Sequence, residues 1–104
     1  MAKIDNLKSL RAIGHTLRPV VTISDAGLTE GVLSETSRAL RDHELIKIKL
    51  SVGDRALKKS TIDSLCEACE AQLVQSIGNT ALLLKHNRKA SAKLSNLTRV
   101  ATQS

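Results

Sequence analysis

The segment from Glu44 to Val52 places the tightest limit on how this chain can fold. Its apolar residues occupy every second position, at Ile46, Ile48, Leu50 and Val52. Lys47 and Lys49 stand between them. A period of two is typical of a β-strand with one buried face, because successive side chains point to opposite sides. We therefore expect a strand whose inner face joins a core and whose outer face presents two lysines.

Neighbouring segments predict a mixed α and β architecture. Helices are predicted where apolar residues recur at intervals of three and four, at 3–17, 28–43 and 55–71. Strands are predicted for the short apolar or β-branched runs, at 20–23, 44–52, 73–77 and 81–85. Gly78-Asn79-Thr80 separates the last two strands and is typical of a hairpin turn. The resulting order is α-β-α-β-α-β-β, an α/β (α+β) fold with one mixed four-stranded sheet, right-handed crossovers and packed helices.

The length favours a single domain. All predicted elements lie within residues 1–90, and 104 residues suffice for one moderate core. Residues 91–104 are small, polar and basic without a clear period, so we expect a flexible tail. Neither a run of about 18 apolar residues nor an apolar N-terminal stretch occurs, so we expect a cytoplasmic protein without a membrane partner.

The charge distribution favours a polyanionic partner. Sixteen Lys and Arg residues oppose ten Asp and Glu residues, for a net charge of +6. Every acidic residue lies at or before Glu70, and five basic residues follow it. The chain contains no Phe, Tyr or Trp, which excludes nucleic-acid binding by aromatic stacking. A basic solubilising segment is the alternative interpretation of the same charge.

Cys66 and Cys69 form a C-x-x-C pair with three possible roles. A zinc site needs about four ligands, but the only histidines are the widely separated His15, His43 and His86. A redox dithiol needs a stabilised thiolate, which the adjacent Glu67 and Glu70 oppose. We favour the third role, in which both thiols are small residues on the inner face of a helix. No metal and no cofactor is expected.

Two common catalytic sequence motifs are absent from the chain. The chain has neither a G-x-x-x-x-G-K-[ST] loop nor an H-E-x-x-H helix. The nearest pair of acids, Asp42 and Glu44, lies at a predicted helix-to-strand junction, where charge is ordinary. We therefore expect no catalysis and no small-molecule substrate.

The stretch after the first predicted strand is a candidate anion site. Loop amides and the first N–H groups of a helix lack intrahelical partners and can bind phosphate. Gly27 can adopt the positive φ that a compact loop requires. Gly31 costs about 1 kcal/mol relative to alanine inside a helix, so we expect a reason for a small side chain there. The alternative to a phosphate site is an ordinary βα turn. The candidate residues are Ser24, Asp25, Ala26, Gly27, Leu28 and Thr29.

Four motifs in order give the chain a family resemblance. They are L-R-P-V-V at 17–21, G-L-T-E-G-V-L at 27–33, H-E-L-I-K-I-K at 43–49 and I-G-N-T at 77–80. Together they resemble the CRM domain (chloroplast RNA splicing and ribosome maturation), most closely its single-domain, YhbY-like bacterial form. The resemblance covers residues 4–90 and implies a fold similar to the C-terminal domain of bacterial translation initiation factor three. It also implies binding of RNA in precursors of the large ribosomal subunit.

The resemblance assigns the loop a role in RNA binding. In the family a G-x-x-G loop meets RNA, and the matching residues here are Ser24 to Gly27, with serine in place of the first glycine. Further candidate phosphate contacts are basic residues near the predicted strands: Arg18, Lys47, Lys49, Lys85, Arg88 and Lys89. The alternative function is a non-catalytic module whose basic face docks an acidic protein.

Overall fold

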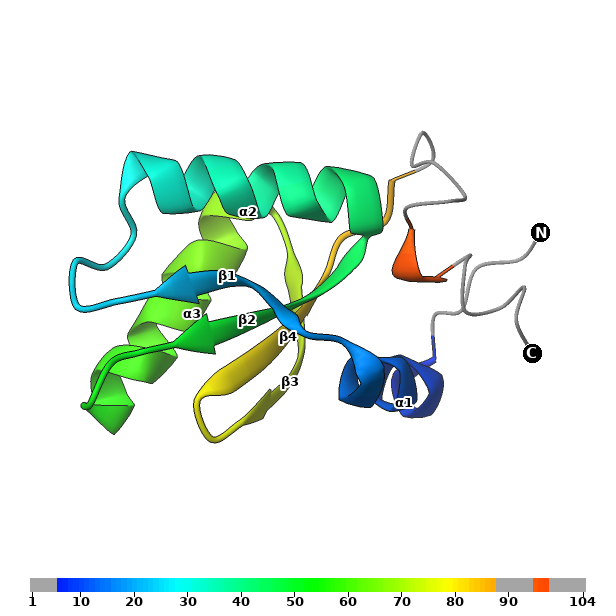
Figure 1. The fold of residues 1–104 in the computed structure, drawn as a ribbon, viewed down its shortest axis with the longest axis horizontal. Helices are drawn as coiled ribbons and strands as arrows, with labels where there is room; N and C mark the ends of the chain where they lie inside the picture. Colours follow the sequence, from blue (N-terminus) through cyan, green and yellow to red (C-terminus); the bar gives the residue numbers. More distant parts are fainter. Residues whose placement is uncertain (1–5, 88–94, 98–104) are drawn as a thin grey trace.

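The computed structural model describes residues 6–87 and 95–97 (Figure 1). In chain order its helices and strands are α1 Leu7–Thr16, β1 Pro19–Ile23, α2 Glu30–His43, β2 Leu45–Leu50, α3 Arg55–Cys69, β3 Gln72–Ile77 and β4 Thr80–Leu84. This confirms the order expected from the sequence. Arg88 and Lys89 lie outside the described residues.

The four strands form one mixed sheet in the order β1-β2-β4-β3. β1 and β2 are parallel, with Ile23 opposite Leu50. β4 runs antiparallel to both of its neighbours, β2 and β3. The hairpin turn at Gly78 has φ +57°, as its turn chemistry predicts. β2 and β4 therefore lie in the middle of the sheet, where both faces can be covered.

Side chains that cap the backbone define where the helices begin. The side chains of Asn6, Thr29 and Asp54 accept hydrogen bonds from backbone amides three residues further on, at 2.9, 3.2 and 3.0 Å. Such caps satisfy amides that have no partner inside the helix. Because Thr29 is the cap, α2 begins at Glu30, two residues after the start expected from periodicity alone.

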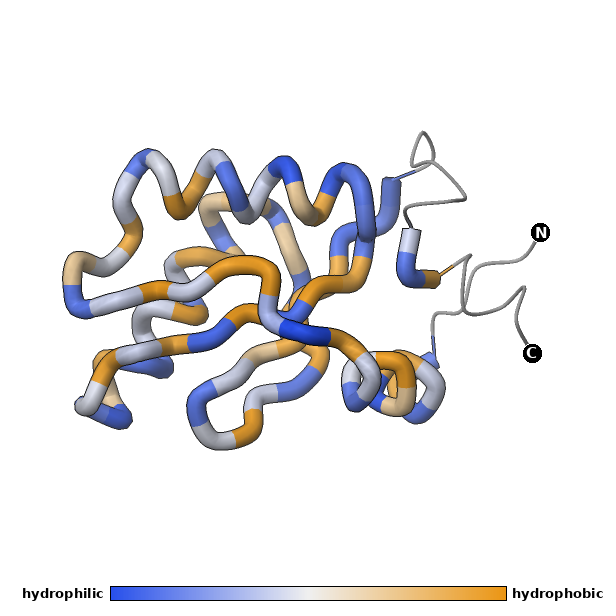
Figure 2. Tube along the Cα trace, in the orientation of Figure 1, coloured by the Kyte–Doolittle hydropathy of each residue, from blue (hydrophilic) through white to orange (hydrophobic). Residues whose placement is uncertain are grey.

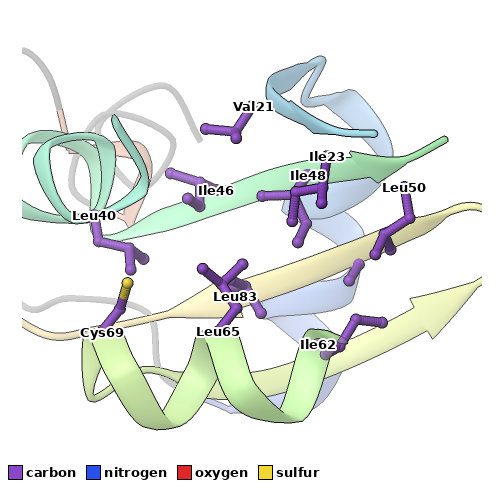
Figure 3. Close-up of a cluster of buried hydrophobic side chains, with 11 residues drawn as sticks. Val21, Ile23, Leu40, Ile46, Ile48, Leu50, Ile62, Leu65, Cys69 and Leu83 are labelled. Carbon is purple, nitrogen blue, oxygen red and sulfur yellow. The ribbon is translucent and has the colours of Figure 1, made fainter. Parts of the chain in front are cut away.

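The main core lies between one face of the sheet and the two helices α2 and α3 (Figure 3). The alternating residues of β2 take part as predicted, with Ile46, Ile48 and Leu50 almost fully buried. Leu40 of α2 and Leu65 of α3 pack against them. Figure 2 shows the corresponding pattern along the chain, with apolar segments in the central strands and polar residues along the outer side of α2.

The other face of the sheet is partly covered, which differs from the polar face that the alternation suggests. Leu10 and Ile13 of α1 pack against Leu45, Leu82 and Leu84 in a second core. Gly14 is buried at this contact, and a Cβ atom on it would lie 2.6 Å from Leu82 Cδ2. The glycine therefore lets α1 approach β4 closely.

Three residues of the expected tail are part of the folded structure. Ser95, Asn96 and Leu97 are buried, and Leu97 joins the second core. Asn96 Nδ2 donates to Leu45 O at 2.5 Å. Composition suggests a detached segment here, but the apolar Leu97 has a site beside α1. The described part of 91–104 thus packs against the domain.

Candidate nucleic-acid interface

The part of the second sheet face that α1 leaves uncovered carries Lys47 and Lys49. We call this surface the open sheet face and define it by Thr22, Lys47, Lys49, Gln75, Ile77 and Thr80. In the strand register Lys49 lies between Thr22 of β1 and Thr80 of β4. Residues with hydroxyl groups therefore neighbour the exposed Lys49 on both adjacent strands, a combination suited to phosphate or ribose.

Lys47 is less exposed than its place in the alternation suggests. The side chain is half-buried, because the end of α1 lies beside it on the same face. Arg18 is exposed and lines, together with Lys47 and His43, a hollow of about 330 Å³. The structure thus brings two of the predicted cations together at the start of β1, with Lys49 further along β2.

The β1–α2 loop lies at the end of the sheet furthest from the described C-terminal residues (Figure 1). It follows Ile23, whose partner in β2 is Leu50, so it adjoins the strand end that carries Lys49. Gly27 has φ +78°, which confirms the left-handed conformation expected for it. Its amide donates to Ser24 O at 2.9 Å and closes the turn.

Several loop amides are already used within the protein. Ala26 N donates to Ser24 Oγ at 3.4 Å, and Thr29 N donates to Gly27 O at 3.1 Å. Within the described residues, the amides of Ser24, Asp25 and Leu28 have no protein acceptor. These three amides are the loop's available anion donors.

The packing around Gly31 does not explain why this residue is a glycine. It is exposed in the first turn of α2, and a Cβ atom there would meet only Thr29 Oγ1, at 3.8 Å. Packing within the described residues therefore gives no reason for a small residue at this position. Any requirement for glycine here would come from a bound partner.

Lys85 lies apart from the other candidate contacts. It follows β4 at the sheet end where Leu84 faces Leu45. Its ammonium group donates to Cys69 O at 2.8 Å and so satisfies a carbonyl at the C-terminal end of α3. The half-buried Lys85 thus has a structural role, which the sequence pattern did not indicate.

The open sheet face also contains polar residues that the sequence analysis did not select. Gln75 of β3 and Thr80 of β4 are half-buried there, and His15 extends from the last turn of α1. A polar side chain within an otherwise apolar strand could have identified Gln75 as a candidate site residue. His15 carried no such signal, because only the packing of α1 brings it to the sheet.

The cysteines belong to the main core. Cys69 is buried and accepts a hydrogen bond from Ser37 Oγ at 3.5 Å, while Cys66 is half-buried against the same core. Burial raises the pKa of the Cys66 thiol, and the negative charge of Asp63 raises it further. This confirms the assignment of Cys69 to the inner face of α3 and places Cys66 at its margin. In the parts of the chain that the structure describes, no three potential metal ligands come together.

Comparison with known proteins decides the family. The model of the CRS1/YhbY (CRM) domain matches residues 3–85. The chain belongs to the CRM family. Among the described residues, no helix is long and apolar enough to cross a membrane.

Relatives of this CRM domain come from several bacteria. A "Probable RNA-binding protein" of Pseudomonas aeruginosa is 48% identical over 94 residues, which is 90% of either chain. An "RNA-binding protein" of Haemophilus influenzae is 40% identical, covering 82% of this chain and 86% of the relative. The CRM domain also resembles a solution structure of a Staphylococcus aureus protein described as a candidate RNA-binding protein. That structure has a TM-score of 0.71 and 26% identity, over 82% of this chain and 88% of the other.

Proposed function

We propose that this CRM protein binds RNA through the open sheet face and the adjoining β1–α2 loop. The observation that carries the proposal is that Lys47 and Lys49 lie on the sheet face opposite the main core, and that Arg18 shares a hollow with Lys47 at the start of β1. The Gly27 turn extends this surface at the end of β1. The names of the relatives support RNA as the ligand.

The chemistry of this surface favours contacts to the RNA backbone. Ammonium and guanidinium groups pair with phosphate, and the Thr22 hydroxyl beside Lys49 can donate to a phosphate or ribose oxygen. The Thr80 hydroxyl donates to Ile77 O, so its oxygen can accept from a ribose hydroxyl. The chain has no aromatic residue on which a base could stack. RNA shape and backbone geometry would therefore dominate affinity, and the protein would act without catalysis.

We further propose a role in the cytoplasm on precursors of the large ribosomal subunit. This part rests on the family resemblance of the motifs around Gly27 and Lys47. Crosslinking in cells followed by sequencing of the bound RNA tests it directly. Enrichment of large-subunit precursor RNA over mature ribosomal RNA is the expected result, and enrichment of unrelated transcripts alone would refute the ribosomal assignment.

Salt titration of RNA binding tests the surface itself. Binding that neutralises phosphates releases counterions, so log affinity should fall linearly with log salt, by about 0.7–0.9 per phosphate. The double variant Lys47→Gln, Lys49→Gln should reduce that slope by about one to two units. The loss should be similar across RNA sequences, because phosphate contacts carry no base information.

A matched control lies on the other side of the molecule. Arg55 and Lys59 are exposed on α3, which covers the opposite sheet face, so Arg55→Gln, Lys59→Gln removes the same charge elsewhere. This control should change the salt slope far less than the strand variant. Equal slopes for the strand variant and the wild type would remove Lys47 and Lys49 from the interface.

A second candidate function is the docking of an acidic protein segment. A hollow of about 290 Å³ between α3 and β3 favours it, because Arg55, Lys58 and Lys59 surround the apolar Leu73 there. Under this alternative, the α3 variant would lose a protein partner, while RNA affinity and its salt slope would not respond to changes at Lys47 and Lys49.

A further inference from the structure

A small recess interrupts the open sheet face where α1 ends. It has a volume of about 150 Å³ and lies over β2, β4 and β3. Gly14 and Leu82 provide apolar lining, and His15, Lys47, Gln75 and Thr80 contribute polar groups. The recess therefore combines an apolar interior with polar atoms beside the proposed phosphate contacts.

The polar groups of this recess offer both donors and acceptors. Thr80 Oγ1 donates its proton to Ile77 O at 3.0 Å, so its oxygen can act toward a ligand only as an acceptor. Lys47 can only donate, whereas the Gln75 amide has both a donor and an acceptor. A phosphate needs donors alone, but the edge of a nucleobase presents donors and acceptors side by side.

The size of the recess also favours a nucleobase as its ligand. Its volume of about 150 Å³ suits a single heterocycle better than a whole nucleotide or a peptide segment. Lys49 adjoins Thr80 in the strand register, outside the residues that line the recess. A base could therefore enter the recess while its own phosphate stays near Lys49.

We propose that this recess takes one unpaired base of the bound RNA, and that Gln75 contacts the edge of that base. The proposal rests on RNA binding as proposed above and adds base contact to a surface otherwise suited to the backbone. Such a recess would compensate for the absence of aromatic residues, because a base can be held by its edge and by an apolar floor instead of by stacking. Gln75 thereby becomes a determinant of base preference.

The test uses hairpin RNAs of identical stem and loop length. One loop carries uridine only, a second carries adenosine only, and a third carries abasic residues with the sugar-phosphate chain intact. The wild type should bind the better base-bearing loop about three- to tenfold more tightly than the abasic loop, the range of one or two neutral hydrogen bonds. Gln75→Leu should remove most of this difference, so that the base-bearing and abasic hairpins bind with similar affinity.

Gln72→Leu is the matched control, since Gln72 lies in the same strand but does not line the recess. It should leave the preference unchanged. Thr80→Val provides a second variant that removes the acceptor with little change in volume, and thermal melting checks that each variant is folded. A folded Thr80→Val protein with reduced base preference supports the recess even if Gln75→Leu fails to fold.

The outcomes separate this proposal from the one on which it rests. Salt-dependent binding that is equal for base-bearing and abasic loops would overturn the recess and leave RNA binding intact. A preference that survives both Gln75→Leu and Thr80→Val would also overturn it. A wild-type protein that binds none of the hairpins would contradict both proposals.

Discussion

Gly14 of α1 lies so close to Leu82 of β4 that a Cβ atom on the glycine would be 2.6 Å from Leu82 Cδ2. Leu82 is buried and surrounded by the second core, so its side chain has little room to move aside. The contact sets how near α1 approaches the sheet. It also places His15, the next residue, over the open sheet face.

Gly14→Ala should therefore destabilise the protein, despite the higher helix propensity of alanine. Overpacking a core of this kind costs about 1–3 kcal/mol, against a propensity gain of at most about 1 kcal/mol. Urea denaturation should show a lower free energy of unfolding with an unchanged slope. A variant as stable as the wild type would show that Leu82 can reorient at little cost.

Gly31→Ala should have the opposite effect. This glycine is exposed, and a Cβ atom on it would meet Thr29 Oγ1 only at an ordinary 3.8 Å. The substitution should raise the free energy of unfolding by about 0.5–1 kcal/mol. The same denaturation experiment, with Gly14→Ala beside it, checks the contrast. A more stable variant with weaker RNA binding would place RNA close to the first turn of α2.

Gly27→Ala should strain the loop without a steric clash. Gly27 has φ +78°, and no atom lies within 4 Å of a Cβ built on it, so the cost comes from the backbone alone. That cost is about 1 kcal/mol or slightly more for a residue with a Cβ atom. Gly27→Asn should lose less, because asparagine tolerates the left-handed conformation. RNA affinity should follow the same order, and unchanged affinity in a folded Gly27→Ala protein would argue against the loop as a contact.

Cys66 should react slowly with iodoacetamide at neutral pH. Burial and the nearby Asp63 raise the pKa of its thiol, so the reactive thiolate forms at higher pH than in an unfolded chain. The alkylation rate should therefore rise only as the pH increases past the ordinary thiol range. Asp63→Asn removes one cause of the shift and should increase the rate at a fixed pH. Mass spectrometry of partially labelled protein distinguishes Cys66 from Cys69, and fast labelling of native Cys66 would contradict the assignment.

Glu44→Gln should loosen the attachment of the C-terminal segment. The fully buried carboxylate accepts hydrogen bonds from Ser95 Oγ at 2.8 Å and from Asn87 N at 2.7 Å. An amide can offer only one oxygen to these donors, so the free energy of unfolding should fall by about 1–3 kcal/mol. Asp42→Asn, two residues earlier and partly exposed, is the control and should change stability by less than about 0.5 kcal/mol. Equal stability of the two variants would show that the buried contacts contribute little.

Local patterns in the sequence were sufficient to predict the helices, the strands and the turns between them. The alternation along 44–52 gave β2 and its buried face, and the residues around Gly27 and Gly78 gave two positive-φ turns. Each of these depends on interactions between residues that are close in the chain, so a single sequence contains the necessary information.

The sequence alone determined the order of elements and the inner face of β2, and it supplied a set of candidate cations for RNA contact. Only the tertiary structure decided that α1 and Leu97 cover part of the other sheet face and that Lys85 donates to a carbonyl at the end of α3. It also decided that His15 and Gln75 line the same recess. Periodicity shows that a helix or strand has a face to bury, but not which distant segment will cover it. That choice depends on contacts between residues far apart in the chain, such as Gly14 with Leu82 and Glu44 with Ser95, which form only when the sheet and its helices pack together.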